Sequence, residues 1–350
     1  MSDEALGWRG EGPEAHLTLT AEQDQAVRAL WNSAAQARQG LDNTMRLLRD
    51  QSAQYSSGLV GDKKAQGVEE VGYSLKGLDS LRRKVAADVR RGLDANRVLG
   101  KVNDLNRYTL TFAPENYTQA TQETYERLKS LGYEPIPGSE KNTWKDPVYK
   151  GLNTTWQHRE TGQKFELQFH TPDSFQAKTD NHELYELARS GHFEQLSAGD
   201  TEQARQYYQA SDLLQNERYQ NVVVPPGNEA LGQEKIRAVL NPEVPVERVE
   251  EVRKMESGLK EQNARKSAAQ TVPQQDGGRE NSQTPGGRSA GVQSKIDALR
   301  AKSERPVPAQ RTSSGRTEQK AAQNRTPAAD RNRDTRGTSQ RADRERGAER

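Results

Sequence analysis

The sequence predicts an α/β fold of the α+β kind, with a mixed β-sheet flanked by helices. Three observations favour it. Residues 163–170 alternate, so that Phe165, Leu167 and Phe169 share one face of a strand. Strand and helix patterns then follow one another between about residues 105 and 190, and the connections mix hairpins with crossovers. Helical patterns precede this region, and a polar tail follows it.

The N-terminal part predicts a flexible leader over residues 1–17 and a helical region over residues 18–69. Thr20 and Gln23 have the spacing of a capping box, which predicts a helix over about 21–50. Gly40 is expected to bend or break this helix. Gly and Ser punctuate residues 51–72, which indicates a linker.

The middle of the chain predicts strands and helices in alternation. A helix is expected over 78–93, where apolar residues recur at helical spacing. Strands are expected at 106–112, 133–136, 151–156 and 163–170, with a hairpin turn at 160–162 before the last. Helices are expected at 116–131, 174–190 and 201–218.

The C-terminal third predicts little core. Hydrophobic residues make up 31% of the 350 residues, charged residues make up 29%, and no aromatic residue follows Tyr219. We expect a helical or extended linker over 226–265 and a disordered, polar, Arg-rich tail over 266–350. Acidic residues interleave with the arginines, so the tail is expected to be a solvated polyampholyte, with binding of RNA or a partner as the alternative.

Composition also excludes several classes of protein. The net charge of +2 does not make the whole chain a binder of nucleic acid by charge alone. The absence of cysteine excludes disulfides and thiolate metal sites. The sequence contains no apolar run of about 18 residues, so no membrane span is predicted. The acidic N-terminus lacks a hydrophobic signal region, so a cytoplasmic location is expected, with export without a cleaved signal peptide as the alternative.

The second face of strand 163–170 carries Glu166, Gln168 and His170. Their side chains are expected about 7 Å apart, two residue rises each. A carboxylate, an amide and an imidazole in a row suit a site for a metal and a nucleotide. The alternative is the solvent-exposed face of a half-buried strand.

Two further segments carry charged side chains suited to phosphate. Lys76, Ser80 and Lys84 surround the start of helix 78–93, where positive charge is unfavourable unless an anion is present. Asp104 and Arg107 lie at the entrance of strand 106–112, where they could hold a divalent metal and a phosphate. The alternatives are a basic exposed helix face and an aspartate that caps a turn.

The last two segments suit the binding of a nucleotide. Tyr149 precedes strand 151–156 in a loop and could offer a flat platform to a base. Lys178, His182, Tyr185 and Arg189 are expected on one face of helix 174–190, which would welcome phosphate. The alternatives are a core tyrosine and a solvated helix face.

Together these segments resemble the synthetase domain of the RelA/SpoT family, the pyrophosphokinases that make alarmones. Lys76, Ser80 and Lys84 fall at the spacing of the family's Arg-x-Lys-x3-Ser-x3-Lys segment, with Ser74 at the position of its arginine. Asp104 and Arg107 are closer together than the family pair. The resemblance covers roughly residues 70–190. Within the family, the residues around Tyr149 and Glu166 look more like those of the small and toxin-type members.

The most specific part of the resemblance is the strand and the helix that follows it. Glu166, Gln168 and Thr171 match the family's Glu-x-Gln-x-x-Thr strand. His182 and Tyr185 match the family's His-x-x-Tyr helix. Tyr149 falls at the tyrosine of its Gly-Tyr-x-Ser-x-His segment, with Asn153 in place of the histidine.

The resemblance implies a nucleotidyltransferase-like sheet, a synthetase domain over residues 70–225, and transfer of the β,γ-pyrophosphate of ATP to a ribose 3′-hydroxyl. Asp104 and Glu166 are the implied catalytic residues and Mg²⁺ ligands. The implied ATP-binding residues are Lys76, Ser80, Lys84 and Arg107, and those on the acceptor side are Tyr149, Asn153, Gln168, His170, Lys178 and His182.

The resemblance leaves the acceptor open between GDP or GTP, an adenine nucleotide and the 3′ end of tRNA. For a toxin-type member it implies an antitoxin or immunity protein as partner, and a homo-oligomer is a further expectation. Two alternatives stand beside the enzyme. One is a catalytically silent nucleotide-binding module. The other is a nucleic-acid-associated interaction protein whose Arg-rich tail is the working part.

Overall fold

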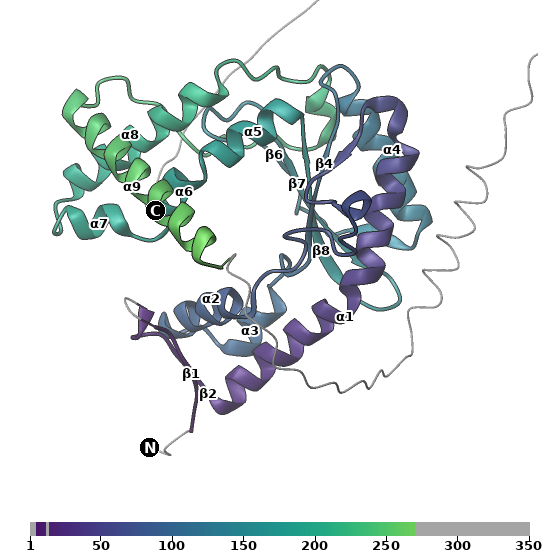
Figure 1. Ribbon diagram of the computed structural model, residues 1–350, viewed down its shortest axis with the longest axis horizontal. Coiled ribbons are helices and arrows are strands. Elements are labelled where there is room, and N and C mark those ends of the chain that lie inside the picture. Colours follow the sequence, from purple (N-terminus) through teal and green to yellow (C-terminus); the bar gives the residue numbers. More distant parts are fainter. Residues whose placement is uncertain (1–4, 12–13, 271–350) are drawn as a thin grey trace, which may run out of the picture. The chain divides into compact units, whose positions relative to one another are not determined.

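The computed structural model describes residues 5–11 and 14–270 (Figure 1). It confirms the predicted fold class, because a six-stranded mixed sheet is flanked by helices. The tail expected beyond residue 270 lies outside the described residues. Within them, no helix is both long and apolar enough to cross a membrane.

The sheet has the strand order β3-β4-β8-β7-β5, and β6 pairs with β7 beside this path. The pairing of β4 with β8 is parallel, and every other pairing in this sheet is antiparallel. The bounds are β3 Gly58–Leu59, β4 Arg107–Thr111, β5 Tyr133–Pro135, β6 Lys141–Asn142, β7 Leu152–His158 and β8 Lys164–His170.

One face of the sheet packs on two helices, α1 (Ala21–Gln51) and α4 (Tyr117–Ser130) (Figure 1). Leu110 and Phe169, side by side on β4 and β8, are fully buried in this core. Because side chains alternate along a strand, the polar residues between them lie on the second face. This alternation separates the core from the candidate site.

Helix α1 begins at the predicted capping box, in which Thr20 and Gln23 exchange side-chain and backbone hydrogen bonds. The predicted break at Gly40 is wrong, because the helix runs without interruption to Gln51. A glycine costs an α-helix only about 1 kcal/mol, and the buried residues on either side, such as Ala34 and Met45, anchor both halves.

The expected flexible leader is also wrong for the residues that the structure describes. Strand β1 (Leu6–Arg9) pairs antiparallel with β2 (Thr18–Thr20). Trp8, Leu17 and Leu19 pack into a second apolar cluster with α1 and α2 (Leu78–Arg90). This burial orders the segment, although its composition alone does not predict it.

The helix expected over 78–93 ends earlier and is followed by a separate helix. Helix α2 covers Leu78–Arg90, and α3 covers Ala95–Gly100 with Asp94 as its N-cap. Gly92 adopts a φ of 87°, which is left-handed and ends α2.

The helix expected over 174–190 is two helices, α5 (Pro172–Asp180) and α6 (His182–Arg189), separated at Asn181. Thr171 caps α5 through a capping box with Ser174. Asn181 is buried and donates its side-chain amide to the carbonyl of Gln215, which fixes the break. The correction matters because Lys178 and His182 lie on different helices.

The segment expected as a linker, 226–265, is part of the folded structure. It contains the short 3-10 helix η4 (Asn228–Leu231) and most of α9 (Val246–Gln270). Val252 on α9 is fully buried in a third apolar cluster, together with α6, α7 (His192–Leu196) and α8 (Thr201–Tyr219). Helix α9 also continues five residues into the segment expected as tail.

Candidate functional site

The second face of the sheet presents two rows of polar side chains across β4, β8 and β7. In the first row, Arg107 pairs in register with Glu166, which pairs with Thr155. The row beside it consists of Thr109, Gln168 and Asn153. The parallel pairing of β4 with β8 therefore brings together residues that lie about 60 positions apart in the sequence.

Glu166 belongs to a chain of contacts that ends on helix α5. Its carboxylate accepts a hydrogen bond from the Gln168 amide, and the Gln168 carbonyl accepts one from Lys178 Nζ. Burial lowers the pKa of Lys178 to about 8; Glu166 opposes this shift and Arg107 adds to it. Glu166 thus has one cationic side chain, Arg107, in its own row, and a second, Lys178, is bonded to Gln168 in the row beside it.

Tyr149, Asn153 and His170 form a second cluster on the same face. The Tyr149 hydroxyl donates to Asn153 Oδ1 at 2.9 Å and lies 3.1 Å from His170 Nε2. Burial, and then Lys178, hold the pKa of His170 well below its usual value, so the imidazole is neutral at neutral pH. Gly151 is needed beside it, because a Cβ there would lie 2.5 Å from the His170 ring.

Asp104 is held by Lys76 and Lys84, the two lysines of residues 74–84, here called the basic segment. Lys76 Nζ lies 2.7 Å and Lys84 Nζ 3.1 Å from its carboxylate oxygens. Burial raises the pKa of Asp104, but the two ammonium groups outweigh burial and lower it to about 2. The predicted ATP-binding lysines and the predicted acid therefore do meet. Ser80 follows on α2, where its hydroxyl accepts from Arg83 at 3.1 Å.

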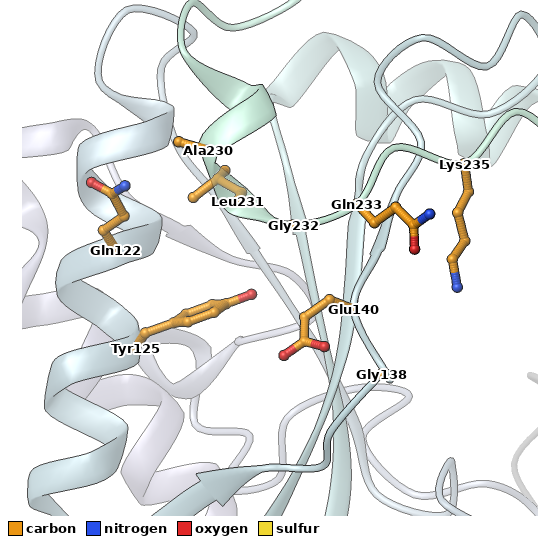
Figure 2. Close-up of a pocket in the computed structure, with 9 residues that line it drawn as sticks. All are labelled: Gln122, Tyr125, Gly138, Glu140, Ala230, Leu231, Gly232, Gln233 and Lys235. Atoms are coloured by element: carbon orange, nitrogen blue, oxygen red, sulfur yellow. The ribbon is translucent and has the colours of Figure 1, made fainter. Parts of the chain in front are cut away.

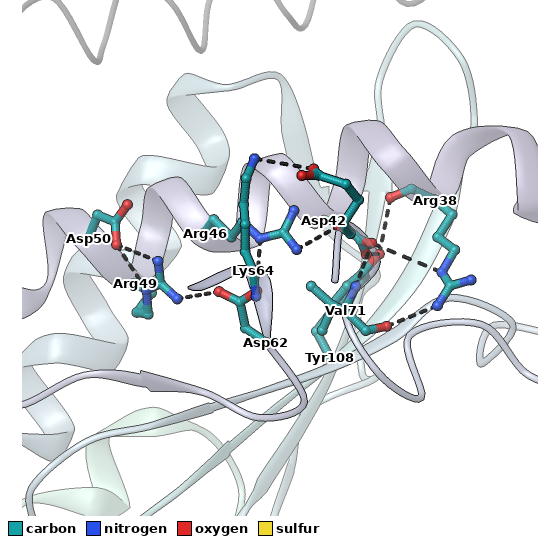
Figure 3. Close-up of polar contacts among 10 residues, drawn as sticks. Arg38, Asp42, Arg46, Arg49, Asp50, Asp62, Lys64, Val71 and Tyr108 are labelled. Carbon is teal, nitrogen blue, oxygen red and sulfur yellow. Dashed lines mark hydrogen bonds and ion pairs between the residues drawn. The ribbon is translucent and has the colours of Figure 1, made fainter. Parts of the chain in front are cut away.

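Helix α1 is bonded to Val71, just before the basic segment, and to Tyr108 of β4 (Figure 3). Arg38 donates to Ser74 Oγ at 2.8 Å and to the Val71 carbonyl at 3.0 Å. Asp42, buried to 1% exposure, accepts from the Val71 N–H and from the Tyr108 hydroxyl. The sequence did not single out Arg38 or Asp42, since a charged residue on a helix resembles any solvated position.

The backbone completes the link between the two predicted phosphate-binding segments. Leu75 forms an isolated antiparallel bridge with Asn106, and Arg107 N–H donates to the Ser74 carbonyl at 3.0 Å. Trp31 of α1 donates its indole N–H to the Lys76 carbonyl at 2.8 Å. Lys76 is thereby fixed beside Asp104, and Ser74 is fixed beside Arg107.

Other predicted residues are not brought into these clusters. His182 begins α6 with an exposed side chain, and it makes no hydrogen bond or ion pair with any residue in the described ranges. Tyr185 is 54% exposed. No interaction links Asp104 to Glu166 directly, and the described part of the chain has no group of three or more His, Cys, Asp or Glu that could hold a metal ion.

A pocket of about 250 Å³ lies apart from these clusters, between α4, the turn before β6 and η4 (Figure 2). Tyr125 and Glu140 project into it, and the buried Tyr125 hydroxyl has no hydrogen-bond partner among the described residues. None of the predicted site residues lines this pocket. It therefore does not belong to the candidate site.

No family model and no curated protein matches the chain. Among solved structures, the chain is similar to smu.1046c from Streptococcus mutans UA159, with 14% identity and a TM-score of 0.34. The match covers 54% of this chain and 91% of that one. A similarity this weak carries no argument about function.

Proposed function

We propose that the protein is a nucleotide pyrophosphokinase that transfers the β,γ-pyrophosphate of ATP to the 3′-hydroxyl of a purine nucleotide. The observation that carries the proposal is the register of β4 against β8, which sets Arg107 beside Glu166. A general base next to a cation that can neutralise phosphate is what such a transfer needs. The Asp104 cluster supplies two more cations.

In the proposed reaction the acceptor 3′-oxygen attacks the β-phosphorus of ATP. The bond between that phosphorus and the oxygen bridging it to the α-phosphorus breaks, and AMP leaves. Glu166 takes the proton of the 3′-hydroxyl, and Gln168 orients the Glu166 carboxylate by donating to it. Arg107, Lys76, Lys84 and the Ser80 hydroxyl bind the ATP phosphates, which compete with Asp104 for the two lysines.

The carboxylates of Glu166 and Asp104 suit magnesium only if substrate phosphates and water complete its coordination. The described residues offer no group of three or more His, Cys, Asp or Glu that could hold a metal ion, but Mg²⁺ commonly binds through one or two carboxylates plus substrate phosphates and water. Glu166 and Asp104 are the carboxylates proposed to hold it. The ion would supply charge neutralisation on the pyrophosphate during transfer.

On the acceptor side, Tyr149 is proposed to stack on the base, with Asn153, His170 and Lys178 around it. The acceptor is proposed to be GDP, GTP or an adenine nucleotide, giving (p)ppGpp or (p)ppApp, with the 3′ end of tRNA as the alternative. A toxin role, with an antitoxin or immunity protein as partner, and self-association belong to the same proposal. We propose a cytoplasmic site of action, with export as the alternative.

The test is incubation of the purified protein with ATP, Mg²⁺ and each acceptor, followed by measurement of AMP and of the pyrophosphorylated product. Glu166→Gln should reduce AMP release at least 10²-fold and leave the unfolding midpoint unchanged within error. Glu134→Gln, on β5, is the matched control and should keep full activity. Expression in a bacterial host should be toxic for the wild type and not for Glu166→Gln.

Two outcomes would contradict the proposal. Undiminished AMP release by Glu166→Gln would refute the role of Glu166 as general base. Binding of ATP by the wild type without turnover on any acceptor would favour the silent nucleotide-binding module. That reading has one supporting observation: a serine, Ser74, stands at the family's arginine position, and it is fully buried and bonded to Arg38.

A further inference from the structure

A segment between η4 and α9 lies along the loop that carries Tyr149. Glu234 forms a parallel bridge with Asn142, and Lys235 N–H donates to the Asn142 carbonyl at 2.7 Å. Lys145 pairs with the Glu234 carboxylate at 2.8 Å. Residues 234–237 thus form a strap, which follows the loop from Asn142 towards Tyr149.

The strap and the loop share one buried carboxylate. Asp146 is completely buried and accepts hydrogen bonds from the backbone N–H groups of Val148 at 2.9 Å and Tyr149 at 3.1 Å. It also accepts from the backbone N–H of Arg237. Backbone hydrogen bonds to a buried charge are costly to break, so the backbone at Arg237 is fixed relative to the backbone at Tyr149.

The side chain of Arg237 covers the ring of Tyr149. The guanidinium carbon lies 4.8 Å from the ring centroid, a cation–π contact. This side chain is 51% exposed, and its ion pair with Asp146 is long, at 4.0 Å. The guanidinium can therefore change rotamer while the strap stays in place.

The spacing leaves no room for a base between the two groups. Stacked carbon atoms lie about 3.5–4 Å apart, so a base between ring and guanidinium needs roughly 7 Å or more. A shift of the guanidinium by about 2–3 Å, well within the reach of an arginine side chain, would open that space. After the shift, the planar guanidinium would lie on the outer face of the base.

We propose that Arg237 is a residue of the acceptor site, which closes over the base stacked on Tyr149. This inference rests on the proposed function, because it needs Tyr149 to bind the acceptor base. The chemical class of ligand is a purine ring, recognised between an aromatic ring and a guanidinium. The sequence did not point to Arg237, since it lies 91 residues from its anchor Asp146.

The test is calorimetric binding of GDP, ADP and inorganic pyrophosphate to the full chain and its variants. Arg237→Ala should weaken binding of GDP or ADP roughly 5- to 30-fold and leave binding of pyrophosphate unchanged, because the lost contact is to the base. Arg237→Lys should lose part of that affinity. The matched control is Arg159→Ala, since Arg159 is also about half exposed, at 55%, and pairs with Glu134 away from Tyr149.

Each other outcome overturns the inference in a distinguishable way. Equal loss for GDP and pyrophosphate would make Arg237 a phosphate ligand, and tighter nucleotide binding would make it a competitor for the Tyr149 ring. Unchanged binding of all three probes by Arg237→Ala would reject the role of Arg237 and would not contradict the proposed function. A wild type that binds no nucleotide would reject the proposed function together with this inference.

Discussion

Replacing Asp104 with asparagine tests the ion cluster that joins the basic segment to β4. In the folded chain the pKa of Asp104 is lowered from 3.8 to about 2, because Lys76 and Lys84 outweigh the effect of burial. The Asp104 side chain is 27% exposed, so solvent screens the cluster only in part. The shift corresponds to about 2 kcal/mol of folding stability at neutral pH.

This contribution has a defined pH window. Because the folded pKa is depressed, the stabilisation is fully present above the unfolded value of 3.8 and is lost as the pH falls towards about 2. Near pH 3 the Asp104 carboxyl is protonated in most unfolded molecules but in few folded ones. About half of the contribution, on the order of 1 kcal/mol, should then remain.

Urea unfolding of the wild type and Asp104→Asn at pH 7 and at about pH 3 measures this directly. We expect Asp104→Asn to be less stable by about 2 kcal/mol at pH 7, and the gap to narrow to about 1 kcal/mol at the lower pH. Asp79→Asn, a 73% exposed partner of Arg82, should change stability by less than about 0.5 kcal/mol. A gap that is the same at both pH values would refute the reasoning.

Two further predictions concern Tyr108, which shares its partner Asp42 with Val71, and Tyr73, which follows Val71. Tyr108→Phe should cost about 1–2 kcal/mol in urea unfolding with an unchanged m-value, because buried Asp42 loses a hydrogen bond of 2.7 Å; no change in midpoint would show that the bond contributes nothing. Tyr73 has a φ of 63° and is 83% exposed. Tyr73→Gly should therefore stabilise the fold by roughly 0.5–1 kcal/mol, whereas Tyr73→Ala, which keeps the left-handed strain, should not. Destabilisation by glycine would mean that the ring makes a stabilising contact.

The elements that could be predicted are those with a local signal. The capping box at Thr20 located the start of α1, and the two-residue alternation at 163–170 separated Phe165, Leu167 and Phe169 from Glu166 and Gln168. Both signals act between near neighbours in the chain. One error occurred where a contact distant in sequence decided the structure: the buried side chain of Asn181 divides the expected helix in two.

The candidate site shows the same division. Lys76, Lys84 and Asp104 were identified as charged residues at element ends, and the structure joins them. His182 was assigned to the acceptor side by resemblance, and its exposed place at the start of α6 adds no contact to that assignment. The role of the first helix had no sequence signal, because only the folded chain shows Arg38 bonded to Ser74.

The sequence by itself determined which residues face the core of each strand and where the capped helices begin, because those choices depend on side chains two to four positions apart. Only the tertiary structure decided that Arg107 lies beside Glu166, that α1 holds the basic segment, and that Arg237 covers Tyr149. These arrangements depend on the register of non-adjacent segments. That register follows from the packing of the whole core, so no local pattern encodes it.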